Sequence, residues 1–144
     1  MEYKSLWVSG IKYRKVKELK KNIDVDVLII GGGMTGLNCA YGLRDSKLKV
    51  CLVEQNRIGM GVSSRTTGKI NYLQECIYSD LEKFNSFDTA KNYLESQLEA
   101  IKKIRNIIKK EKISCDLDRV ASYVLAFNDE EYFKLKKEYN ILKK

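Results

Sequence analysis

Residues 25–54 read VDVLIIGGGMTGLNCAYGLRDSKLKVCLVE, and this stretch decides the fold. It begins with an apolar run, Val25–Ile30, which is typical of a parallel strand that is covered on both faces. A glycine-rich turn follows, and then a helical segment to about Asp45. A second apolar run, at about residues 48–53, ends at Glu54. The pattern predicts a strand, a crossover helix and a second, parallel strand, which together make a βαβ unit of an α/β protein.

The turn Gly31–Gly36 carries a dinucleotide-binding motif in the expected context. Gly31 is expected to permit the tight turn out of the strand, where a Cβ would clash, and Gly33 to let the backbone approach a pyrophosphate. Gly36 is expected to let the helix lie close to the sheet. The helix N-terminus offers unpaired N–H groups and a partial positive charge to phosphates. The alternative is a glycine-rich turn of an ordinary α/β protein that binds nothing.

An acid stands where a ribose-binding acid is expected. Glu54 lies 18 residues after Gly36, near the spacing of roughly 20 residues seen in dinucleotide-binding domains. Its carboxylate would accept hydrogen bonds from ribose hydroxyls and would repel a 2′-phosphate, so NADP is disfavoured. The turn alone explains neither Glu54 nor the segment that follows it.

The remainder of the chain is expected to contain one loop, two helices and one strand. Gln55–Leu73 is rich in Gly, Ser, Thr and basic residues and is interpreted as a long functional loop. A long amphipathic helix is predicted over Ser86–Glu111, with Ser86 as N-cap. Val120–Phe127 is predicted to be a strand, because it is rich in β-forming residues. Asn128 and Asp129 then open a charged helix to Lys144.

Apolar residues recur along one face of the long helix. This stripe is predicted to pack in the core rather than to form a partner groove; it comprises Leu94, Leu98, Ile101, Ile104 and Ile108.

The N-terminal lead-in, Met1–Asn22, is polar and contains the apolar triplet Leu6-Trp7-Val8. This triplet either packs on the domain as a short extended arm or belongs to a disordered tail.

Composition excludes several classes of protein. The net charge is +8, from 27 Lys and Arg against 19 Asp and Glu, and is interpreted as a solvated basic surface, because no nucleic-acid-binding module is recognisable. No run approaches the ~18 apolar residues of a membrane span, and no signal peptide is evident. The chain has no histidine and no CxxC pair, so no metal site is expected. We expect a cytoplasmic protein with reduced cysteines.

The loop after Glu54 favours FAD over NAD as the dinucleotide. A simple NAD domain usually continues quickly into another helix, whereas residues 57–69 present glycines, hydroxyls and cations. Small residues let backbone N–H groups face a ligand, and hydroxyls and cations match the phosphates and flavin edge of an extended FAD molecule. The alternative is a flexible polar loop without a ligand.

These residues resemble a known family. GGGMTGLNCAYGL, followed by VEQNRIGMGVSSRTTGKI, is similar to the N-terminus of the FAD-dependent oxidoreductases of the D-amino-acid oxidase and glycine oxidase superfamily. It resembles especially a bacterial branch whose members often carry a C-terminal Rieske iron–sulfur domain. Ser5-Leu6-Trp7 matches a Ser-Leu-Trp near the start of that branch, and Arg65–Ile70 matches its RTTAKI-like segment. The first 70 residues carry most of this resemblance.

The resemblance implies a cofactor, a reaction and a set of binding residues. The cofactor is FAD, and the reaction is hydride transfer from an amine or amino acid to the flavin. Gly31, Gly33, Gly36 and Glu54 would hold the ADP half, Arg57 would lie near the adenosine, and residues 63–68 would line the path to the isoalloxazine. No catalytic residue is assigned. The full set of predicted cofactor-binding residues is Gly31, Gly33, Met34, Thr35, Gly36, Glu54, Gln55, Arg57, Ser63, Ser64, Thr66, Thr67 and Gly68.

The chain departs from the family in its length. Members are much longer than 144 residues, so the sequence is interpreted as an N-terminal portion that is inactive alone and is partnered by the rest of a longer chain, including a Rieske domain in some members. We expect an arm at residues 1–23, an FAD-binding βαβ unit and loop at 24–72, and a long helix, a strand and a helix of an incomplete substrate-type domain at 73–144. The alternatives are a non-catalytic NAD- or ADP-binding module and a small NAD-binding regulator.

Overall fold

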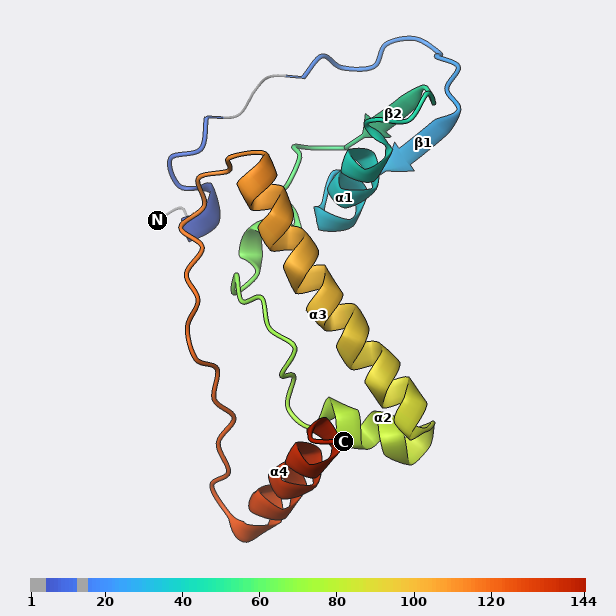
Figure 1. Ribbon diagram of the computed structural model, residues 1–144. Helices are drawn as coiled ribbons and strands as arrows, with labels where there is room; N and C mark the ends of the chain where they lie inside the picture. Colours follow the sequence, from blue (N-terminus) through green and yellow to red (C-terminus); the bar gives the residue numbers. More distant parts are fainter. Residues whose placement is uncertain (1–4, 13–15) are drawn as a thin grey trace. The chain divides into compact units, whose positions relative to one another are not determined.

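A computed structural model of the protein describes residues 5–12 and 16–144. The chain divides into two compact units, Met1–Gly68 and Lys69–Lys144 (Figure 1). Among its described residues, the first contains a parallel pair of strands with one helix and two short 3₁₀ turns, and the second contains three helices. In chain order the elements are η1 (Leu6–Val8), β1 (Val27–Ile30), α1 (Met34–Leu43), β2 (Val50–Val53), η2 (Val62–Arg65), α2 (Ile77–Phe84), α3 (Phe87–Lys110) and α4 (Asp129–Leu142).

The first unit contains the predicted βαβ arrangement. β1 and β2 pair in parallel, with Val27 opposite Val50 and Ile30 opposite Val53. The chain passes from one strand to the other through α1 (Figure 1). Gly36, Ala40 and Leu43 of α1 are half-buried. This spacing places them on one face of the helix, and it lets the helix approach the strands closely.

Only one face of β1 is covered, and this corrects the expectation of a strand covered on both faces. The side chain of Ile29 lies against α1 and is 8% exposed, whereas Leu28 is 53% and Ile30 81% exposed. Side chains alternate between the two faces of a strand. In the described part of the chain a single helix packs on this sheet, so the side chains on the other face stay exposed.

The second unit is built around a small core of Tyr78, Ala90 and Ile141, contributed by α2, α3 and α4. The predicted long helix and final helix are confirmed, and so is Ser86 as the N-cap of the long helix. The Ser86 side chain accepts the Thr89 N–H at 3.1 Å. The Asn128 side chain accepts the Glu131 N–H at 2.9 Å.

Three sequence-based expectations for local structure are wrong. Residues 113–126 are irregular, so Val120–Phe127 is not a strand. β-forming residues need a neighbouring strand to complete their hydrogen bonds, and the two strands of the described chain both lie in the other unit. Leu6–Val8 packs on the first unit, as one of the two alternatives held, but it does so as a 3₁₀ turn and not as an extended arm. The eight-residue helix α2 was not expected at all.

The apolar stripe of α3 is core only at its beginning. Leu94 packs against the buried cluster, whereas Leu98 is 45% exposed and the later stripe residues are half-buried. The expectation of a core-packing stripe therefore holds for the part of α3 that α2 and α4 cover. In the part of the chain that the structure describes, no helix has both the length and the apolar character needed to cross a membrane.

Candidate functional site

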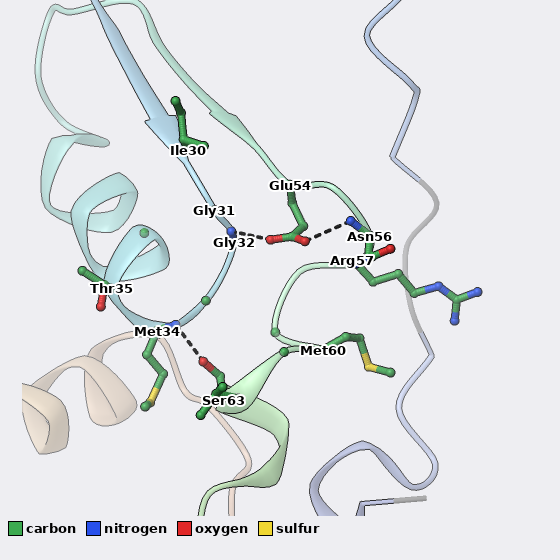
Figure 2. A pocket seen from close by; sticks show the side chains of 15 residues that line it. Ile30, Gly31, Gly32, Met34, Thr35, Glu54, Asn56, Arg57, Met60 and Ser63 are labelled. Carbon is green, nitrogen blue, oxygen red and sulfur yellow. Dashed lines mark hydrogen bonds between the residues drawn. The ribbon is translucent and has the colours of Figure 1, made fainter. Parts of the chain in front are cut away.

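A cavity of about 540 Å³ lies in the first unit, where the turn after β1 meets the loop after β2. Its walls come from two short stretches of sequence, residues 30–36 and residues 54–63 (Figure 2). The lining residues are Ile30, Gly31, Gly32, Gly33, Met34, Thr35, Gly36, Glu54, Asn56, Arg57, Gly59, Met60, Gly61, Val62 and Ser63. The cavity thus stands at the carboxyl ends of two parallel strands, the usual place for ligands of open α/β sheets.

Glycine is required at two positions of the turn for two different structural reasons. Gly31 has a φ of +102°, a conformation that side chains rarely adopt, while a Cβ there would meet no atom within 4 Å. Glycine is therefore needed at this position for its backbone conformation and not, as expected, to avoid a clash. At Gly36 a Cβ would lie 2.0 Å from the Gly31 carbonyl oxygen and 3.3 Å from Ile29 Cγ2. This confirms that the third glycine allows α1 to pack against the strand.

The Glu54 carboxylate is held by backbone N–H groups on both sides. Its Oε2 accepts the Gly32 N–H at 2.7 Å, and its Oε1 accepts the Asn56 N–H at 2.9 Å (Figure 2). These hydrogen bonds, first that of Asn56 and then that of Gly32, lower the pKa of Glu54 below its ordinary value. The acid is consequently ionised at neutral pH, and each oxygen retains lone pairs that can accept further hydrogen bonds.

The N-terminus of α1 receives its cap from a distant side chain. Its N-cap residue, Gly33, has no side chain, and the Met34 N–H donates instead to Ser63 Oγ at 3.0 Å (Figure 2). A Cβ at Gly33 would lie 3.3 Å from the same Ser63 oxygen. An oxygen acceptor therefore already lies at the helix end where phosphate oxygens bind in dinucleotide sites.

The loop after β2 is also tied directly to the glycine turn. The Gly59 N–H donates to the Gly32 carbonyl at 2.8 Å, and Gly32 is itself buried. The Arg57 side chain extends away from Glu54 and the glycine turn (Figure 2). The two walls of the cavity are consequently one connected structure.

The structure brings eight of the predicted binding residues to this cavity and leaves five outside its lining. Those that line it are Gly31, Gly33, Met34, Thr35, Gly36, Glu54, Arg57 and Ser63. Those outside are Gln55, Ser64, Thr66, Thr67 and Gly68. Among the latter, the Ser64 hydroxyl is buried and donates to the carbonyls of Met60 and Gly61, so it fixes the η2 turn.

Sequence reasoning pointed to the glycines of residues 57–69, of which Gly59 and Gly61 line the wall opposite the turn, but it missed two backbone contributors. Gly32 and Asn56 supply the two N–H groups that hold Glu54. Side chains of these residues make none of the contacts, so residue chemistry gave no signal. The available indication in the sequence was the large number of glycines in these stretches, because glycine allows two main-chain segments to approach each other closely.

The donors and acceptors of the cavity fit the ADP half of a dinucleotide. Helix N–H groups and a glycine cradle suit a pyrophosphate, and an ionised acid at the end of β2 suits ribose hydroxyls. The sequence model of the family described as DAO, FAD dependent oxidoreductase, matches residues 26–144. The chain belongs to this family of FAD-dependent oxidoreductases. The family match covers both units of the structure.

Named relatives align along most of the chain. A protein named as a Rieske 2Fe-2S iron-sulfur protein, YhfW of Bacillus subtilis, is 28% identical over 92% of this chain and 26% of its own length. Gamma-glutamylputrescine oxidoreductase of Escherichia coli is 32% identical over 90% of this chain and 30% of its own. Glycerol 3-phosphate oxidase of Mycoplasma genitalium is 34% identical over 83% of this chain and 27% of its own.

The chain thus spans less than a third of the length of these relatives. No solved structure gave a significant match.

Proposed function

We propose that the chain is the FAD-binding portion of a flavin-dependent oxidoreductase, with the ADP half of FAD in the cavity of the first unit. One observation carries the proposal: the ionised Glu54 and the N-terminus of α1 meet at the same cavity. A bound adenosine ribose and pyrophosphate need these two groups at once.

Each stretch of the site receives a role in this proposal. The turn Gly31–Gly36, with Met34 and Thr35, holds the pyrophosphate through backbone N–H groups. Glu54 holds the ribose, with Gln55 and Arg57 toward the adenosine. Residues 63–68, which include Ser63, Ser64, Thr66, Thr67 and Gly68, lead from the pyrophosphate toward the isoalloxazine.

The proposed substrate is an amine or an amino acid. When bound, FAD supplies a hydride acceptor for the carbon that carries the amine. The relative named gamma-glutamylputrescine oxidoreductase supports this class. A second candidate, an alcohol of the glycerol phosphate kind, is favoured by the relative named glycerol 3-phosphate oxidase. The residues of this chain bind and orient the cofactor, and the catalytic groups are proposed to lie in further parts of a longer chain.

A binding experiment tests the proposal. The purified chain is titrated with FAD, NAD and ADP by calorimetry, and its flavin spectrum is recorded. We expect FAD to bind tighter than NAD, and Gly33→Val to lower the FAD affinity at least roughly tenfold by filling the cradle. Gly42→Val is the matched control, because a Cβ at Gly42 would meet no atom within 4 Å.

Equal affinities for FAD in the wild type and the Gly33→Val variant would overturn the placement of the pyrophosphate. If NAD or ADP bound as tightly as FAD and no flavin were retained, the chain would be a nucleotide-binding module and not a flavoprotein portion.

A further inference from the structure

The N-terminal turn η1 is hydrogen-bonded to the loop that follows the cavity. The Ser5 hydroxyl donates to the Ser64 carbonyl. The Trp7 indole N–H donates to the Thr66 carbonyl at 2.5 Å. Both acceptors are main-chain groups of one stretch, Val62–Gly68, which we call the cofactor loop. Two side chains from the beginning of the chain therefore hold alternate carbonyls of this loop.

The indole also lies close to the end of the cofactor loop. A Cβ at Gly68 would be 2.7 Å from Trp7 Cη2 and 2.7 Å from Cζ2. Gly68 has a φ of +70°, a conformation in which L side chains are strained. The glycine thus provides both the turn and the surface on which the indole rests.

Trp7 is linked to the cavity through the cofactor loop. The loop begins one residue before Ser63, whose hydroxyl accepts the Met34 N–H at the helix end. Ser64 is fixed within η2 by its bonds to Met60 and Gly61. η1 holds the main chain that directly follows Ser63, so the position of Ser63 depends on the contacts of η1.

We propose that Ser5 and Trp7 form an N-terminal clamp that holds the cofactor loop in the conformation that binds FAD, with Trp7 as a positioning residue. The inference rests on the proposed function. A loop that is only partly in its binding conformation lowers the apparent affinity by the fraction that is competent. Holding the loop in advance removes this cost.

The test combines affinity with a measurement on the cofactor-free chain. FAD affinity is measured for Trp7→Phe, which keeps an aromatic ring but loses the N–H donor, for Ser5→Ala and for Ser5→Thr. We expect roughly three- to tenfold weaker binding for Trp7→Phe and Ser5→Ala, the effect of one hydrogen bond. Ser5→Thr, which restores the hydroxyl, should bind like the wild type. Leu6→Ala is the matched control from the same turn, because Leu6 is 78% exposed.

Hydrogen exchange of the chain without FAD provides the second readout. Amides of residues 63–68 and of Met34 should exchange faster in Trp7→Phe, while those of β1 and β2 should be unchanged. A general loss of stability would accelerate all of them. Trp7 is also the single tryptophan of the chain, so its fluorescence should shift to the red in Gly68→Ala, where a Cβ would displace the indole.

The outcomes separate the clamp from the proposed function. If the wild type binds FAD and the Ser5 and Trp7 variants bind it equally well, the clamp is wrong and the FAD site stands. If the wild type binds no FAD, the proposed function fails and the clamp has no binding role. Unchanged exchange in residues 63–68 of Trp7→Phe would overturn the clamp in either case.

Discussion

Glu54 and Gly32 are joined by a hydrogen bond of 2.7 Å between the carboxylate Oε2 and the backbone N–H. It links the end of β2 to the turn after β1, so the residue expected to bind the ribose also shapes the glycine turn. The pKa of the carboxyl is lowered because the charged form accepts this bond and that of Asn56. The ionised form of Glu54 is therefore the form that fits the folded turn.

The first prediction concerns Glu54→Gln, which keeps the shape of the side chain and removes its charge. We expect FAD affinity at neutral pH to fall roughly tenfold, since hydrogen bonds to a charged group are about twice as strong as neutral ones. Because the pKa of Glu54 is lowered in the folded chain, its carboxylate stays ionised below the ordinary value of 4.5, and its contribution to FAD affinity is lost only as the pH falls through the lower folded value.

Calorimetric titrations from neutral to acidic pH provide the measurement. The acid-dependent loss of affinity due to Glu54 should be missing in the Gln variant. Glu130→Gln is the control, since it removes one charge in the other unit, where Glu130 pairs with Lys134 at 2.7 Å. Identical affinity of the Glu54→Gln variant and the wild type at neutral pH would contradict the ribose role.

The second prediction compares two glycines of α1. Gly36→Ala places a Cβ 2.0 Å from the Gly31 carbonyl oxygen, so we expect it to destabilise the first unit by about 1–3 kcal/mol, the usual cost of overpacking. Gly42→Ala meets no atom within 4 Å and should stabilise the helix by about 0.4–1 kcal/mol. Urea unfolding followed by circular dichroism measures both. Equal effects of the two substitutions would show that α1 does not pack closely on β1.

The βαβ unit could be predicted from the sequence because the residues that form its strands, turn and helix lie within 30 consecutive positions. The spacing from Gly36 to Glu54 follows from the geometry of one crossover. The caps Ser86 and Asn128 were likewise predictable, since a cap is set by residues within one turn of it.

Features that depend on distant partners could not be predicted in the same way. Val120–Phe127 has the composition of a strand, but a strand exists only beside another strand. The cap of α1 comes from Ser63, 29 residues away, and η1 is fixed by Ser64 and Thr66, each 59 residues away. No local pattern shows which distant residue will supply such a bond.

The third prediction concerns Glu138, a buried acid of α4 that is 4% exposed. Its two oxygens accept the N–H groups of Tyr78 at 2.9 Å and Ser79 at 2.6 Å. It thereby caps α2, whose N-cap residue Cys76 makes no side-chain bond. We expect Glu138→Ala to destabilise the second unit by roughly 2–4 kcal/mol, because two buried N–H groups lose a charged acceptor.

Thermal unfolding followed by circular dichroism measures this effect. Glu138→Gln should lie between the wild type and the Ala variant, since its amide retains one acceptor oxygen. Glu130→Ala, on the exposed face of the same helix, should leave the unfolding midpoint unchanged, because exposed ion pairs contribute little. A Glu138→Ala variant as stable as Glu130→Ala would mean that α4 does not cap α2.

The fourth prediction concerns the alkaline limit of stability. Tyr78 is 1% exposed, and its hydroxyl donates to the Tyr72 carbonyl at 2.5 Å. Burial, and then the nearby Tyr93 and Glu138, raise the pKa of Tyr78 to about 12 from its ordinary value of 10.0. The folded state therefore holds this proton to higher pH than the unfolded chain. The stability that Tyr78 contributes is complete below pH 10.0 and decreases as the pH rises toward about 12.

Tyr78→Phe tests this directly, because it removes the ionisable group and keeps the ring. At neutral pH we expect the variant to be less stable by about 1 kcal/mol, the value of one hydrogen bond. Above pH 10.0 the wild type should lose stability faster than the variant, so that the two curves converge toward pH 12. Urea unfolding at a series of alkaline pH values gives both curves. Parallel curves would show that the phenol of Tyr78 ionises equally readily in the folded and unfolded chains, and that the ring is not buried in the core of the second unit.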